Sequence, residues 1–178
     1  MSAPATNQGG KPGNSTTRGA AAPGRQLTAA APLWVQLTTL ALSLGGLGVS
    51  LYLTIAHYST ATTLACPDTG VINCEKVTTS PQSVIFGIPV ALLGLIFYLF
   101  MTGVNSPWAW QANLPPLRWI RLGSLIAGII FVLYLIYTEL FTLNAICLWC
   151  TSVHIITILL FALIVPTAQR APGHNQTQ

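Results

Sequence analysis

The chain has 178 residues, of which 52% are hydrophobic and only 6% are charged, and its formal net charge is +4. Soluble domains carry about 25% charged residues, so this composition excludes an ordinary soluble protein and indicates an integral membrane protein. The length suits one compact helical bundle. Basic residues are scattered along the chain and form no basic face, which argues against nucleic acid as a partner.

Residues 1–31 are rich in Ala, Gly, Pro, Ser and Thr and hold almost no large apolar side chain. Such a segment cannot bury enough surface to offset the entropy lost on ordering, so we expect a disordered tail. It also lacks the arrangement of a usual signal peptide. We expect one membrane domain over residues 32–166 and a second disordered tail over residues 167–178.

Four apolar segments follow, at about residues 33–56, 84–104, 122–143 and 148–165. A membrane-spanning helix needs about 17–25 residues, and each segment falls within that range. Strands are excluded because an open sheet edge cannot face lipid and because no alternating pattern is present. Small residues three or four apart within the segments indicate closely packed helices. The sequence therefore predicts an all-α integral membrane fold, a bundle of four transmembrane helices.

An outer loop joins the first two apolar segments. Ser80 and Pro81 form a good helix start, because serine can cap a helix and proline is tolerated at the first helical position. Pro89 lies further along and would kink or interrupt a helix. We therefore expect a short half-helix near the membrane surface, leading into the second transmembrane helix.

The distribution of basic residues predicts the orientation in the membrane. The N-terminal tail has three basic residues, and Arg118 and Arg121 lie between the second and third segments, whereas Lys76 is alone in the outer loop. Because cytoplasmic loops are enriched in Lys and Arg, we expect both termini in the cytoplasm. All four cysteines then lie on the outer side of an inner membrane, where a bacterial cell is oxidising and disulfides persist.

The four cysteines form two pairs of different kinds. Cys147 and Cys150 enclose two residues at the start of the last segment, where a helix N-terminus favours a thiolate. Cys66 and Cys74 lie in a polar loop that can move. A mobile dithiol facing a fixed dithiol suits a thiol relay, in which each exchange proceeds through a mixed disulfide. A static structural disulfide beside an unrelated pair is the alternative, and a CxxC pair also supplies zinc ligands.

A dithiol at the membrane surface must pass its electrons onward, and a membrane-soluble quinone is the natural acceptor. His154 shares a helix face with both cysteines of the CxxC pair and would donate a hydrogen bond to a quinone oxygen or assist proton transfer. A buried, hydrogen-bonded histidine is the structural alternative. Ser83 and Gln82 are further candidate donors. Two other polar side chains near predicted helix ends are interpreted as interfacial, His57 and Glu139.

With these features the chain resembles the vitamin K epoxide reductase family, and specifically its bacterial members, from about residue 34 to residue 165. The order of the pairs carries the resemblance: a wide loop pair comes first, and a CxxC that opens the last helix comes second. Other bacterial quinone-linked disulfide oxidases place their CxxC in the first outer loop and fit less well. Further matching positions are Val77, Ser80, residues 86–89, Gly94, residues 134–140 and residues 146–150.

The resemblance implies a membrane thiol:quinone oxidoreductase that supports disulfide bond formation. It implies that Cys66 and Cys74 take electrons from a partner, that Cys74 exchanges with Cys147, and that Cys150 lies nearest the quinone. The partner of such proteins is a secreted thioredoxin-like protein. We expect it to be a separate chain here, because this chain ends about a dozen residues after the last segment.

The resemblance also bears on the electron acceptor. The animal enzymes have a tyrosine where His154 falls and an asparagine near where Ser83 falls. We therefore expect a respiratory quinone, menaquinone or ubiquinone, rather than vitamin K epoxide.

Two other interpretations stay open. A tetraspan membrane scaffold would keep a permanent Cys66–Cys74 bond and a dispensable CxxC pair. A metal site would use all four cysteines with His154, but an oxidising compartment works against free thiolate ligands, and we predict no metal.

Overall fold

A computed structural model describes residues 31–59, 64–67, 69–112 and 114–169. The expected tail over residues 1–31 lies outside the described residues except for residue 31. Of the expected tail over residues 167–178 only residues 167–169 are described, and they continue the last helix. The described chain is mostly helical. Three stretches in it are long and apolar enough to cross a membrane: α1 (Leu33–Tyr58), α5 (Pro115–Tyr137) continued by the π-helical η2 (Thr138–Leu143), and α6 (Leu148–Gln169).

The fourth apolar helix, α3 (Val90–Val104), is shorter than the predicted segment over residues 84–104. Its 15 residues span about 22 Å, less than the ~30 Å of a bilayer core. Pro89 stands at its N-cap, where the missing N–H does no harm.

The residues before α3 differ from the prediction. A 3-10 turn, η1 (Pro81–Ser83), lies where we expected a half-helix, and Ser80 caps it without a side-chain hydrogen bond. An antiparallel hairpin follows, β1 (Val84–Ile85) and β2 (Ile88–Pro89), although the sequence predicted no strands. Phe86 and Gly87, with φ of 51° and 80°, form its turn, and this left-handed backbone ends the helical path.

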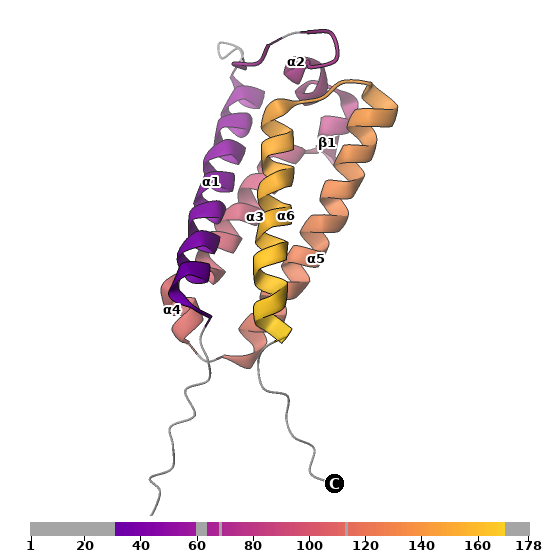
Figure 1. Ribbon diagram of the computed structural model, residues 1–178. Helices are drawn as coiled ribbons and strands as arrows, with labels where there is room; N and C mark the ends of the chain where they lie inside the picture. The colour runs from indigo at the N-terminus through magenta and orange to yellow at the C-terminus, as the bar shows by residue number, and fades with distance from the viewer. Residues whose placement is uncertain (1–30, 60–63, 68, 113, 170–178) are drawn as a thin grey trace, which may run out of the picture.

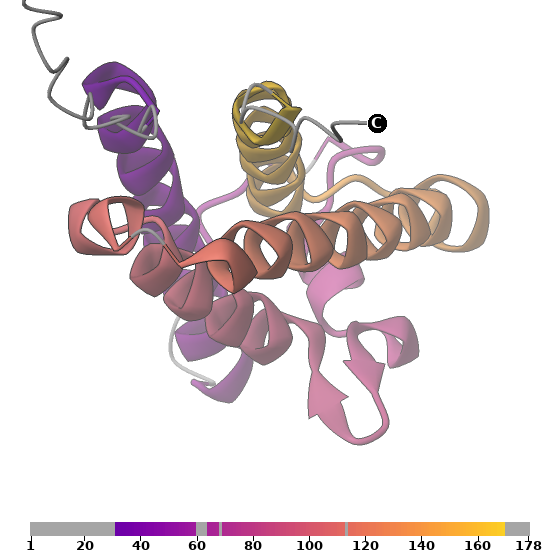
Figure 2. The same cartoon turned by 90° about the horizontal axis from the view of Figure 1, so that it is seen from below.

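The four apolar helices form an up-and-down bundle (Figure 1). Helix α1 packs against both α3 and α6, and α5 packs against α6, as the view along the bundle also shows (Figure 2). The short α2 (Cys74–Thr78) and the hairpin lie at the end of the bundle where α6 begins, and α4 (Pro107–Gln111) lies at the opposite end. Both cysteine pairs therefore lie at one end of the bundle.

A glycine sets the distance between α1 and α3. The Tyr98 ring is fully buried against Gly46, where an added Cβ would overlap ring atoms. The Tyr98 hydroxyl donates to the carbonyl of Val153 at 2.9 Å and lies 2.8 Å from the Thr157 hydroxyl, so it ties α3 to α6. Not every small residue of the first apolar segment makes such a contact. Nothing lies within 4 Å of an added Cβ at Gly45 or Gly48.

The end of the bundle away from the cysteines is closed by a buried arginine. Arg121 donates from Nε at 2.8 Å and from Nη2 at 2.6 Å to the carbonyl of Val104, the last residue of α3. Its guanidinium stacks on the Trp110 ring, 3.8 Å from the centroid. One of the basic residues used to predict orientation thus also satisfies a helix-end carbonyl, which otherwise would lack a partner.

Candidate functional site

The outer loop holds the first cysteine pair as a disulfide. Cys66 and Cys74 are bonded, with their Cα atoms 6.1 Å apart. Cys74 opens α2, whose first turn is capped by Asn73, because the Asn73 side chain accepts a hydrogen bond from the N–H of Lys76 at 2.8 Å. Cys74 is only 1% exposed, whereas Cys66 is half-buried. The two sulfurs of one disulfide therefore differ in accessibility.

A backbone bridge aligns this loop with the segment before α6. Ile72 pairs with Ile146 as a parallel bridge. The N–H of Ile146 donates to Val71 O at 2.8 Å, and the N–H of Asn73 donates to Ile146 O at 3.1 Å. Cys74 lies two residues after Ile72 and Cys147 directly follows Ile146, and both cysteines are buried in one apolar cluster.

The Cys66 side of the loop is tied to α6 by aromatic residues. The Trp149 indole N–H donates to Ala65 O at 3.1 Å, and the N–H of Ala65 donates to the Tyr52 hydroxyl at 3.1 Å. The two rings lie 4.9 Å apart between centroids. Cys66 thus packs against the same cluster as Cys147 and Cys150, and the structure brings all four predicted cysteines together.

Cys147 occupies the N-cap position of α6. Its carbonyl accepts the N–H of Thr151 at 2.8 Å, and its sulfur accepts the N–H of Cys150 at 3.2 Å, as an oxygen does in an ordinary cap. A hydrogen bond from the Cys150 side chain lowers the pKa of Cys147, while burial and the negative charge of Glu139 act in the opposite direction. Cys147 and Cys150 are both free thiols. This environment favours Cys147 as the thiolate of the pair.

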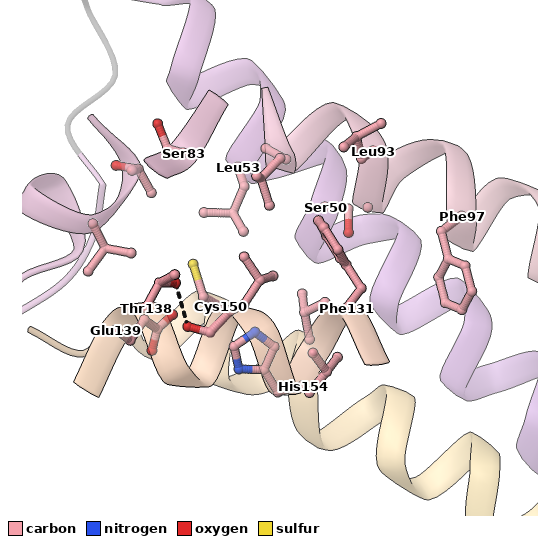
Figure 3. A pocket seen from close by; sticks show the side chains of 18 of the residues that line it. Ser50, Leu53, Ser83, Leu93, Phe97, Phe131, Thr138, Glu139, Cys150 and His154 are labelled. Carbon is pink, nitrogen blue, oxygen red and sulfur yellow. Dashed lines mark hydrogen bonds between the residues drawn. The ribbon is translucent and has the colours of Figure 1, made fainter. Parts of the chain in front are cut away.

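Cys150 faces a cavity of about 380 Å³ inside the bundle. The cavity is lined mainly by apolar side chains from α1, α3, α5 and α6, and it extends from Cys150 toward Tyr98. Figure 3 shows Cys150 pointing into this space, with Glu139 and His154 on either side of it and Ser83 across the cavity. The predicted residues Cys150, His154 and Ser83 therefore meet at one cavity.

The polar groups of the cavity differ in their free hydrogen-bonding capacity. His154 is 4% exposed, and within the described part of the chain neither ring nitrogen has a hydrogen-bond partner. The Ser83 hydroxyl donates to Ser80 O at 2.6 Å, which leaves only its lone pairs free. The Gln82 amide oxygen is buried without a partner among the described residues. The sequence allowed His154 to be a buried histidine that is held by a structural hydrogen bond. Among the described residues no such hydrogen bond to its ring is present.

Two residues that we interpreted as interfacial also line the cavity, His57 and Glu139. Glu139 is only 6% exposed, so that interpretation is wrong for this residue. The signal in the sequence that could have indicated a role at the site was a carboxylate inside an apolar segment, eight positions, or about two helical turns, before Cys147. The π-helical geometry of η2, which turns this side chain toward the cysteines, leaves no mark in the sequence.

Comparison with known proteins gives one family. A model described as the vitamin K epoxide reductase family matches residues 37–165, most of the chain and all the helices that surround the cavity. No curated protein sequence matches the chain.

Proposed function

Because the chain belongs to the vitamin K epoxide reductase family, whose members are membrane oxidoreductases of thiols and quinones, we propose that it oxidises the thiols of a partner and reduces a membrane quinone. The observation that carries the proposal is the contact of two cysteine pairs in one cluster, with Cys150 opening onto an apolar cavity.

Electrons enter at the loop disulfide. A partner thiolate attacks the more accessible sulfur, Cys66, and releases Cys74 as a thiolate; the partner's second thiol then displaces Cys66, so that both loop cysteines are reduced. Cys74 then attacks Cys147 of an oxidised inner pair and releases Cys150 next to the cavity. Cys66 in turn attacks Cys74, which restores the loop disulfide and releases Cys147. The structure has the loop pair oxidised and the inner pair reduced. This corresponds to the state in which electrons have reached the inner pair and the loop is ready for another partner.

The cavity suits a quinone head group. Ligand pockets are typically about 300–1,000 Å³ and mostly apolar with a few polar groups, and this cavity agrees on each count. A bound quinone accepts two electrons and two protons. His154 would donate a hydrogen bond to a quinone oxygen, because its ring nitrogens have no partner among the described residues. Ser83 and Gln82 offer lone pairs, so they would accept from the hydroxyls of the reduced form.

We propose a multi-pass protein of the bacterial inner membrane with four spans, the fourth being α3 extended by the hairpin that precedes it. Both termini lie in the cytoplasm, and the cysteine pairs lie on the outer side. The partner is a separate, secreted thioredoxin-like protein, and the acceptor is menaquinone or ubiquinone. Disulfide bond formation in secreted proteins would be the result.

A trapping experiment tests the path. In Cys150→Ala no inner disulfide can form, so the Cys147 thiolate can only attack Cys74 of the loop disulfide and release Cys66. The resulting Cys74–Cys147 disulfide has no Cys150 thiol to resolve it, so it should accumulate in cells and be found by mass spectrometry. The purified variant should not reduce a short-chain quinone with a reduced thioredoxin-like protein as donor. Ser152→Ala, on the exposed side of the same helix, is the control and should behave as wild type. Normal turnover by Cys150→Ala would contradict the proposal.

A further inference from the structure

A carboxyl group lies at the inner cysteine pair, yet the electron path described above does not use it. Glu139 is 6% exposed and lines the same cavity as Cys150. Its carboxyl group interacts with the backbone N–H of Cys147. Within the described residues no basic side chain forms an ion pair with it. A buried carboxyl without a cation is costly in an apolar bundle, so its presence calls for a chemical explanation.

The local backbone directs Glu139 to this place. η2 is π-helical, and a π-helix turns a side chain away from the face that an α-helix would give it. The segment ends at Asn144, whose left-handed φ of 46° reverses the chain. The Glu139 carbonyl then accepts the N–H of Ala145 at 3.2 Å, which leads the chain directly back to Cys147. Figure 3 shows the result, with Glu139 beside Cys150 at the cavity.

We propose that Glu139 is a proton carrier for the inner cysteine pair, a role that rests on the proposed function. When the dithiol is oxidised, two S–H bonds break, one S–S bond forms, and two electrons and two protons leave for the quinone. Glu139, as a carboxylate, takes one thiol proton and passes it to a quinone oxygen, so that the carboxylate is restored in each cycle. His154, with its free ring nitrogens, lies at the same cavity to carry the other proton.

The titratable groups around Glu139 are few. Cys147 directly precedes α6, Cys150 and His154 lie in α6, and His57 from α1 and Tyr98 from α3 line the same cavity. Helix α2 packs against η2 and carries Glu75 and Lys76, which are both exposed. A change in pH dependence on altering Glu139 is therefore attributable to the thiols or to the histidine and tyrosine side chains of the cavity.

A purely structural role is the competing explanation, in which the carboxyl only holds the N–H of Cys147. Two variants separate the roles. Glu139→Gln keeps an amide oxygen for that N–H but cannot carry a proton, and Glu139→Asp keeps the carboxyl group. Glu75→Gln removes an exposed carboxylate from the adjoining α2 and serves as the matched control.

The first measurement needs no quinone. The full chain with Cys66→Ala and Cys74→Ala is reduced, purified in detergent, and alkylated with iodoacetamide between pH 5 and 10, and labelling of Cys147 is followed by mass spectrometry. Removing the nearby negative charge should move the Cys147 midpoint to lower pH in Glu139→Gln. Glu139→Asp and Glu75→Gln should keep the original midpoint. An unchanged midpoint in Glu139→Gln would overturn the proposal.

The second measurement is the rate at which the reduced inner pair reduces a short-chain quinone in a single turnover, as a function of pH. Loss of a proton carrier should slow Glu139→Gln about a hundredfold, with a rate that rises with pH as hydroxide replaces the carboxylate, and Glu139→Asp should recover most of the rate. A wild-type rate and pH profile in Glu139→Gln would overturn the proposal. If the unmodified protein reduces no quinone, the proposed function fails, while the alkylation midpoints still report on Glu139.

Discussion

Replacing Gly46 by alanine tests whether the α1–α3 contact is as close as the structure has it. The added Cβ would overlap the ring of Tyr98, which is fully buried. The ring cannot move away freely, because its hydroxyl is bonded to Val153 O at 2.9 Å and to Thr157 at 2.8 Å. Overpacking a core costs about 1–3 kcal/mol. Losing the two hydrogen bonds costs roughly 1 kcal/mol each. We therefore expect Gly46→Ala to lower the free energy of unfolding by about 3–5 kcal/mol.

The measurement is an unfolding titration of the detergent-solubilised protein with sodium dodecyl sulfate, followed by circular dichroism. Gly45→Ala and Gly48→Ala are matched controls on the same helix, since nothing lies within 4 Å of an added Cβ at either position. Alanine is the better helix former by up to about 1 kcal/mol, so the controls should be neutral or stabilising. If Gly46→Ala unfolds at the same detergent concentration as the two control variants, α1 and α3 are further apart than described, and the cavity boundary near Tyr98 is wrong.

Two further predictions concern the thiol of Cys147 and the hydrogen bond by which Trp149 holds the outer loop. The lowered pKa of Cys147 means that its thiolate persists at pH values where an ordinary thiol is protonated, and alkylation should fail only as the pH falls through this lower value. In a chain that lacks both loop cysteines, Cys150→Ala removes the hydrogen bond that lowers this pKa, so the alkylation midpoint should rise; a fall would refute the assignment. Trp149→Phe retains a ring against Tyr52 but loses the 3.1 Å hydrogen bond to Ala65 O, worth about 1 kcal/mol. Amide exchange over residues 64–67 should then be roughly fivefold faster than in Leu148→Ala, the exposed neighbour, and equal rates would show that Trp149 does not hold the loop.

Composition and segment length were enough to place the long helices. α1 and α6 begin where the apolar segments predicted them, and the stretch formed by α5 and η2 ends where predicted but begins at Pro115 rather than near residue 122. No internal proline or glycine turn interrupts these helices before their last residues. The second segment was predicted too long. Pro89 and the left-handed turn at Phe86 and Gly87 end the helical path, and hydropathy does not register either effect.

The sequence predicted the candidate site residues but not how they meet. The contact between the cysteine pairs depends on the bridge between Ile72 and Ile146, a pairing of residues far apart in the chain that no local pattern encodes. The burial of Glu139 depends on a π-helical turn, and an α-helical reading of the same residues gives it a different face. Long-range register and helix type are therefore what the structure adds to the candidate site.

The bridge between Ile72 and Ile146 has a kinetic consequence. Because it holds the loop disulfide against Cys147, the proposed exchange between the pairs would be intramolecular, and well-oriented groups of this kind reach effective molarities of up to about 10⁵–10⁸ M. Free small thiols at millimolar concentration would compete poorly against such a neighbour. The proposed internal transfer would therefore be insulated from the thiols of the surrounding medium, and a partner protein that reaches Cys66 would have an efficient route into it.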